Sequence, residues 1–166
     1  MEPGTFFPVH VAWVDAIARI ALSILFALSI GIERFAHKKP IDFRPFVIIS
    51  LSSCGLGLLV MELPFTSADA NLSIDPAKVI SGVMGGIGFL GAGVLFREGD
   101  IVKGAGSAAS IWSAGAIGLI CGMGFLWLGG LIALGIVVLL LVSRRLVETD
   151  RYTASLANED EEKANR

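Results

Sequence analysis

The sequence predicts an all-α integral membrane protein, a bundle of about five transmembrane helices, on the basis of its composition, its apolar blocks and its charge distribution. Hydrophobic residues make up 54% of the 166 residues, charged residues make up 17%, and the mean hydropathy is +0.76. These values are typical of membrane proteins. The apolar residues gather into blocks that approach the roughly 20 residues an α-helix needs to cross a hydrocarbon core of about 30 Å.

The first three helices are predicted from three of these blocks. We expect them at about residues 14–32, 45–63 and 77–96. Pro45 and Pro64 frame the second block. The third block contains most of the glycines that are discussed below.

The last two blocks, at about residues 107–125 and 126–143, almost touch in sequence. Gly122, Gly124 and Trp127 predict a very tight turn between them. One kinked, overlong helix is the alternative. Two antiparallel helices are favoured, because a single span would need nearly twice the thickness of the bilayer.

Cationic residues follow each of the first, third and fifth predicted helices. In the loops after the second and fourth helices, Lys78 is the only cationic residue. The positive-inside rule therefore places the N-terminus outside and the C-terminus in the cytoplasm, as an odd number of spans requires. We expect a multi-pass protein of the bacterial inner (plasma) membrane. Residues 1–146 would form the transmembrane domain, and the polar, acidic residues 147–166 a disordered cytoplasmic tail.

The run GGIGFLGAGVLF, residues 85–96, contains Gly86, Gly88 and Gly91 in the G-x-G-x-x-G spacing of dinucleotide-binding loops. Such a loop needs a preceding strand, a solvent-open turn and an acidic residue about 20 positions later, and this segment has none of them. In the middle of a span an exposed loop would leave backbone polar groups unpaired in lipid. The glycines therefore favour a helix.

Glycine lets the backbones of two membrane helices approach closely. Small residues also recur every four positions along the fourth helix, which predicts a small stripe on one face. We expect this stripe to pack against the third helix or a second subunit, giving a homo-oligomer; a narrow functional crevice or a broken helix is the sharper alternative. The predicted packing residues are Gly82, Gly86, Gly88, Gly91, Gly93, Gly106, Ser110, Ala114, Gly118 and Gly122.

Charged groups in or near the spans are the candidates for function, because burying a charge in lipid costs a few kcal/mol by insertion scales. Asp15 and Arg19 are spaced for an i to i+4 ion pair or for a polar cavity. A cluster of charged residues at the cytoplasmic end could face a partner or simply be a solvated loop. The polar candidates are Asp15, Arg19, Glu33, Arg34, Arg44, Arg97, Asp100, Lys103 and Ser107, with Glu98 beside them.

No enzyme, cofactor, metal site or nucleic-acid partner is expected. His10 and His37 fall on opposite sides of the membrane in the predicted topology, so they cannot act together. Magnesium needs only one or two carboxylates, which makes chance matches such as Glu33 with Asp100 easy to find. The same holds for the outer carboxylates Glu62, Asp69 and Asp75.

Two ordered segments carry a resemblance to a known family. GGIGFLGAGVLFREGDIVKGAGSAASIWSAGAIGLICGMG resembles the signature region of the MgtC/SapB family of bacterial inner-membrane proteins, and IGIERFAHKKPIDFRP, residues 30–45, resembles its other landmark. The resemblance covers about residues 17–140. This chain has Gly106 and Ser107 where the family commonly has two hydroxyl or amide side chains, and Pro45 and Phe46 follow Arg44 in place of the usual Thr-His pair. Many relatives also carry a soluble C-terminal domain, which is not expected in this sequence because only about 20 residues follow the fifth predicted helix.

The resemblance implies a non-enzymatic regulator that acts in adaptation to low magnesium and to host-associated stress and virulence. Some members of the family are described as restraining ATP synthase, so a membrane-protein partner of this kind is expected besides the lipid bilayer. The alternative is a channel or carrier for Mg²⁺ or another small solute. In that case the glycine-lined third and fourth helices would form the path, with Glu33 or Arg97 near its inner mouth.

Overall fold

The computed structural model describes residues 7–36, 42–66, 74–98 and 101–143. Within these ranges the chain forms five α-helices and one short β-hairpin, so the prediction of five helices is confirmed. Four of the helices are long and apolar enough to span a membrane, and Pro76–Ala92 is apolar but shorter. The predicted tail, residues 147–166, lies outside the described residues.

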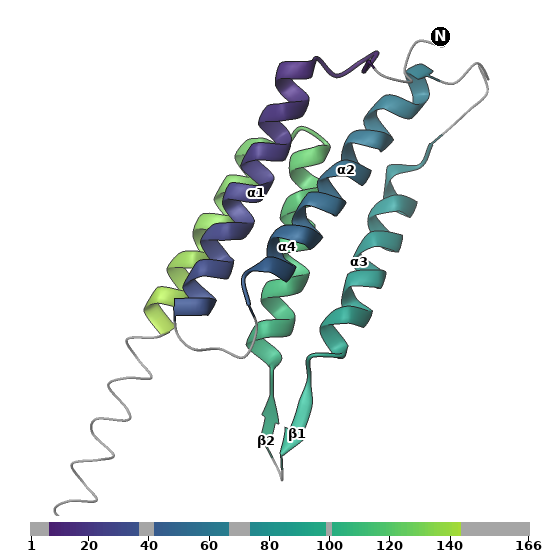
Figure 1. Ribbon diagram of the computed structural model, residues 1–166. Helices are drawn as coiled ribbons and strands as arrows, with labels where there is room; N and C mark the ends of the chain where they lie inside the picture. The colour runs from purple at the N-terminus through teal and green to yellow at the C-terminus, as the bar shows by residue number, and fades with distance from the viewer. Residues whose placement is uncertain (1–6, 37–41, 67–73, 99–100, 144–166) are drawn as a thin grey trace, which may run out of the picture.

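The helices run alternately down and up through the bundle (Figure 1). They are α1 (Trp13–Ala36), α2 (Arg44–Thr66), α3 (Pro76–Ala92), α4 (Ala105–Gly122) and the C-terminal helix (Leu126–Ser143). Asp75 caps the start of α3 by accepting a hydrogen bond from the Ala77 backbone N–H at 2.9 Å, and Pro76 follows it in the first turn.

The turn between α4 and the C-terminal helix is as tight as expected. Gly124 has φ +95°, a left-handed conformation that favours glycine, and Phe125 donates a backbone hydrogen bond to the Ile120 carbonyl oxygen. The alternative of one kinked, overlong helix is therefore wrong.

The third helix ends earlier than predicted. It stops at Ala92, and the chain continues into β1 (Phe96–Glu98) and β2 (Ile101–Lys103), which pair antiparallel with Phe96 opposite Lys103. The sequence predicted only a polar turn here. Three-residue strands are too short to give a readable alternation of apolar and polar residues.

Helix α4 lies at the centre of the bundle and contacts α1, α2 and α3. Its closest neighbour is α2. A Cβ atom at Gly118 would overlap the carbonyl oxygen of Ser50, and one at Gly122 would overlap that of Cys54. From the other side, a Cβ at Gly57 would lie 2.8 Å from the Leu119 carbonyl oxygen. Gly118 and Gly122, the last two members of the small stripe of α4, therefore pack backbone to backbone against α2, where the sequence had suggested the third helix or a second subunit.

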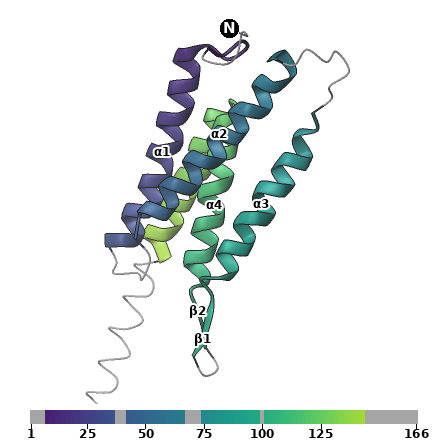
Figure 2. The same cartoon turned by 45° about the vertical axis from the view of Figure 1, so that its right-hand side comes forward.

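The glycines of α3 are placed differently from the expectation. At Gly82, Gly86 and Gly88, a Cβ atom would have no atom of another element within 4 Å, so these glycines do not make a tight contact with α4. Gly93 ends the helix and would meet only the carbonyl oxygens of the last turn. Gly91 is the exception, since a Cβ there would lie 3.5 Å from the Ala108 carbonyl oxygen of α4. Further along, the buried Ile87 of α3 packs on Gly115 of α4, and α3 lies to one side of the other helices (Figure 2).

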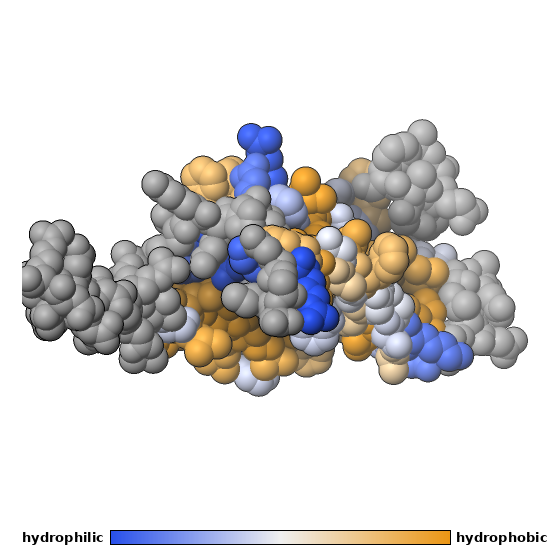
Figure 3. Space-filling model, turned by 90° about the horizontal axis from the view of Figure 1, so that it is seen from below, coloured by the Kyte–Doolittle hydropathy of each residue, from blue (hydrophilic) through white to orange (hydrophobic). Residues whose placement is uncertain are grey.

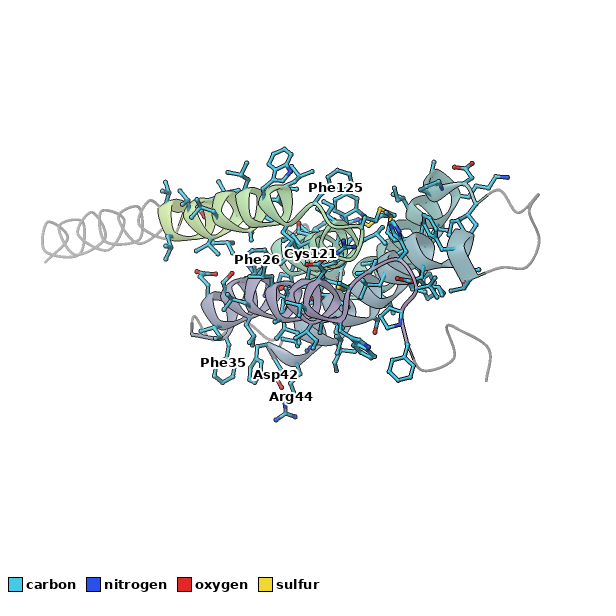
Figure 4. All side chains as sticks on the ribbon, turned by 90° about the horizontal axis from the view of Figure 1, so that it is seen from above. Phe26, Phe35, Asp42, Arg44, Cys121 and Phe125 are labelled. Carbon is cyan, nitrogen blue, oxygen red and sulfur yellow. The ribbon has the colours of Figure 1, made fainter. Side chains whose placement is uncertain are left out.

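The C-terminal helix covers the opposite side of the bundle. A Cβ at Gly129 would lie 2.9 Å from Cys121 Sγ, and one at Gly130 would lie 3.3 Å from the Phe26 ring. Figure 4 shows Phe26 and Cys121 between α1, α4 and this helix. The two glycines therefore let the helix approach the core closely.

Candidate functional site

The most unusual side chain of the molecule is Arg34, in the last turn of α1. It is only 8% exposed, and its Nη2 donates a hydrogen bond of 2.7 Å to Oγ of the buried Ser107 in the first turn of α4. The Nε atom is buried and has no hydrogen-bond partner among the described residues. Two predicted polar candidates, separated by 73 positions in the chain, are therefore in direct contact.

Gly106 makes room for this contact. A Cβ at this position would lie 3.2 Å from Arg34 Nη1 and 3.4 Å from Nη2. A larger side chain would press on the guanidinium group, so the departure from the family pattern at Gly106 lies directly at the buried arginine. Gly106 itself is exposed, as is the neighbouring Ala105.

The N-terminus of α4 faces the same group. The N-cap Gly104 has φ +91° and makes no side-chain capping bond, and the first intrahelical bond runs from Ala108 N–H to the Gly104 carbonyl oxygen. The first turn thus presents backbone N–H groups and the positive end of the helix dipole beside a guanidinium group. Figure 3 views this end of the bundle and shows hydrophilic residues between hydrophobic flanks.

Arg97 and Lys103 of the predicted charged cluster lie on the hairpin, whereas Arg34 lies in α1. Both hairpin residues are exposed, each with an interaction of its own, and Glu33 is half-buried in α1. Asp100 and the side chain of Glu98 lie outside the described residues. The cluster is therefore divided between a buried arginine and an exposed hairpin.

Arg44 points away from the bundle, as Figure 4 shows for Arg44 and Asp42. Its side chain is 76% exposed, and its Nε lies 3.1 Å from Asp42 Oδ2. Exposed ion pairs of this kind contribute little to stability, about 0–1 kcal/mol. Its place in the fold is the start of α2, where Asp42 also accepts a hydrogen bond from the Phe43 backbone N–H.

Within the described residues, Arg19 does not form the ion pair with Asp15 that the spacing of the two residues suggested. It donates from Nη1 to the carbonyl oxygen of Gly122 at 2.9 Å, and its guanidinium group packs against Gly124. It thereby satisfies a carbonyl group at the C-terminal end of α4, where a cation is favoured by the helix dipole. Asp15 is exposed, and the two side chains form no ion pair within the described ranges.

Glu62 is a residue whose role sequence reasoning missed. Its carboxylate accepts hydrogen bonds from the backbone N–H groups of three consecutive residues, Val9, His10 and Val11, with 2.9 Å to Val9 N and 3.1 Å to His10 N. The His10 ring also stacks on Phe65 with centroids 3.9 Å apart. These contacts fasten the segment before α1 to the end of α2. A lone acidic residue near a helix end carries no signal for such a contact.

In the described part of the chain, no three His, Cys, Asp or Glu side chains lie close enough to share a metal ion. Of the carboxylates considered for magnesium, Asp69 and Asp100 lie outside the described residues. Glu62 and Asp75 are engaged with backbone N–H groups.

An apolar groove of about 390 Å³ runs between α2 and α3. Its walls include Ile48 and Leu56 of α2, and Gly82, Gly86 and Leu90 of α3. Gly82 and Gly86, two of the open glycines described above, thus lie in one wall of this groove.

Comparison with known proteins identifies the relatives of the chain. The profile of the MgtC family matches residues 20–149. Protein SapB of Bacillus subtilis is 30% identical over 113 residues, which are 67% of this chain and 49% of SapB. Protein MgtC of Salmonella typhimurium is 32% identical over 108 residues, 65% of this chain and 43% of MgtC.

A third relative, an uncharacterized protein of Haemophilus influenzae, is 33% identical over 132 residues, 78% of this chain and 54% of that protein. The chain spans about half the length of the curated relatives it matches. No solved structure matches it. With a profile match over most of its length, the chain belongs to the MgtC family of membrane proteins.

Proposed function

We propose that this chain is a non-enzymatic regulator of the bacterial inner membrane that acts during adaptation to low magnesium and host-associated stress by binding another membrane complex, of which ATP synthase is the first candidate. The family supplies the physiological setting. The observation that carries the mode of action is the open, glycine-bearing face of α3, where a Cβ at Gly82, Gly86 or Gly88 would have no atom of another element within 4 Å.

This face suits lateral binding of a membrane helix. Glycine in a transmembrane helix allows a second backbone to approach closely, and van der Waals packing then drives association in lipid. Gly118 and Gly122 of α4 already pack against α2 within the subunit. The open glycines of α3 make no such contact in the described chain, so they remain available to a partner or to a second copy in a homo-oligomer.

The same geometry does not favour the alternative function, a channel or carrier. A path between α3 and α4 would need the glycines of both helices to line it. Gly118 and Gly122 of α4 instead contact the α2 backbone closely, and Gly82 and Gly86 of α3 line the groove beside α2. The regulator therefore fits the arrangement better.

The test compares Gly86→Leu with Gly135→Leu. Both glycines have open space around the missing side chain, but Gly135 lies on the C-terminal helix, so the same volume is added on another face. Each variant is expressed in a strain that lacks the native protein. We expect Gly86→Leu to abolish growth support at low magnesium and crosslinking to the subunits of ATP synthase, whereas Gly135→Leu retains both.

Flux measurements separate the rival. Mg²⁺ uptake into liposomes carrying the folded protein should not exceed that of empty liposomes. Uptake above this background that Gly86→Leu reduces would overturn the regulator in favour of a transporter. Equal crosslinking of the two variants to the partner would show that the α3 face is not the binding surface.

A further inference from the structure

The charge of Arg34 is poorly matched by its surroundings. The residue is 8% exposed, its Nη2 donates to a neutral hydroxyl group, and its buried Nε has no partner in the described chain. Glu33 offsets part of the charge through its Coulombic field, but Arg34 makes no ion pair within the described residues. Buried charges normally need both a counter-ion and full hydrogen bonding.

The position of the guanidinium group adds to the mismatch. It lies at the first turn of an 18-residue helix, α4, whose N-cap Gly104 supplies no capping side chain. The positive end of a helix dipole disfavours a cation and favours an anion. A bound anion would therefore correct two unfavourable features at once, the uncompensated cation and the uncapped N–H groups.

The guanidinium group reaches the exposed surface of α4 at Gly106, where glycine has no side chain to cover it. The position of its missing side chain lies 3.2 Å from Arg34 Nη1, and both Gly106 and Ala105 are exposed. Ser107 uses its oxygen to accept from Arg34, and its own O–H group is still able to donate. The guanidinium group and the helix N-terminus thus meet at one exposed position, with the buried Ser107 hydroxyl group bonded to the guanidinium group behind it.

We propose that Arg34, Ser107 and the first turn of α4 bind the phosphate group of an anionic ligand. A guanidinium group matches the oxygens of phosphate with two parallel hydrogen bonds, and helix N-termini bind phosphate through backbone N–H groups. The phosphate of a membrane lipid headgroup and free inorganic phosphate share this chemistry, and the site lies at the end of the bundle where either can reach it.

The test uses the purified full chain and four proteins: the parent, Arg34→Gln, Gly106→Asn and Arg44→Gln. Arg44→Gln removes the same charge from an exposed arginine near the same end of the bundle. Gly106→Asn keeps Arg34 but fills the anion position with an amide group, so the proposal stays testable if Arg34→Gln does not fold. Calorimetric titration with inorganic phosphate at constant ionic strength is one arm. The second arm is the lipid retained, by native mass spectrometry, after purification from vesicles of equal phosphatidylglycerol and phosphatidylcholine.

We expect the parent and Arg44→Gln to bind, and Arg34→Gln and Gly106→Asn to bind about tenfold more weakly or worse, because a charge-assisted hydrogen bond is lost or its site is occupied. Phosphate binding without retention of phosphatidylglycerol assigns the site to a soluble anion, and retention of phosphatidylglycerol without phosphate binding assigns it to a lipid. No binding in either arm by the parent overturns the proposal. So does binding that Gly106→Asn leaves unchanged, or that Arg44→Gln weakens as much as Arg34→Gln does.

Discussion

At the scale of single residues, two glycines with the same sequence signature have different surroundings. A Cβ at Gly118 would overlap the Ser50 carbonyl oxygen, whereas Gly86 has open space. We expect Gly118→Ala to lower the free energy of unfolding by about 1–3 kcal/mol through overpacking. Gly86→Ala should leave it unchanged or raise it by about 0.5–1 kcal/mol, because alanine favours helix. Reversible unfolding in detergent measures both, and equal losses would contradict the close packing of α4 on α2.

This contrast also marks what can be predicted from sequence at this scale. The four-residue spacing from Gly106 to Gly122 predicted a small stripe on α4, and its last two members contact the α2 backbone. Its neighbour was not predictable, because spacing defines a face of one helix and says nothing about which helix meets it. The Arg34–Ser107 contact was not predictable for the same reason, because only the folded arrangement brings together side chains that are 73 positions apart.

A second prediction at the residue scale concerns Glu62, which holds three backbone N–H groups of the segment before α1. In Glu62→Ala these donors lose their acceptor, so hydrogen exchange of residues 9–11 should accelerate about tenfold or more. Mass spectrometry of exchanged peptides reads this out. Asp15→Ala, which removes an exposed carboxylate from the start of α1, serves as the control. Unchanged exchange in Glu62→Ala would argue against the anchor.

At the scale of elements, the end of α4 depends on a side chain of α1. Arg19 donates to the Gly122 carbonyl oxygen in a partly buried contact. Arg19→Gln should therefore lower the free energy of unfolding by about 1–3 kcal/mol, the range for hydrogen bonds to charged groups. Asp15→Asn should have little effect, because the two residues form no ion pair in the described structure. An equal loss of unfolding free energy in Asp15→Asn would indicate that an Asp15–Arg19 ion pair stabilises the protein.

The elements themselves were largely predictable from the sequence. All five apolar blocks are helices, because a membrane-spanning helix requires a long uninterrupted apolar run that is easily seen. The hairpin Phe96–Lys103 was missed because its two strands have only three residues each. For a related reason the end of α3 was placed a few residues too late, since Val94, Leu95 and Phe96 continue the apolar composition of the helix beyond Ala92.

At the scale of the whole molecule, the predicted orientation can be tested with cysteines introduced at opposite ends. Asp75 precedes α3 at one end and Val102 lies on the hairpin at the other; both are exposed. The native Cys54 and Cys121 are fully buried, so they need not be removed. With the N-terminus outside, a membrane-impermeant maleimide should label Asp75→Cys in intact cells, and should label Val102→Cys only after lysis. The reverse pattern would invert the topology.

The hairpin has a further consequence for the molecule. It joins α3 to α4 without slack, since a Cβ at Gly104 would overlap the Val94 carbonyl oxygen and the two strands are paired. The end of helix α3 is therefore connected closely to the first turn of α4. Consequently, we expect a partner that tilts α3 to displace the first turn of α4, where Ser107 and Gly106 contact Arg34.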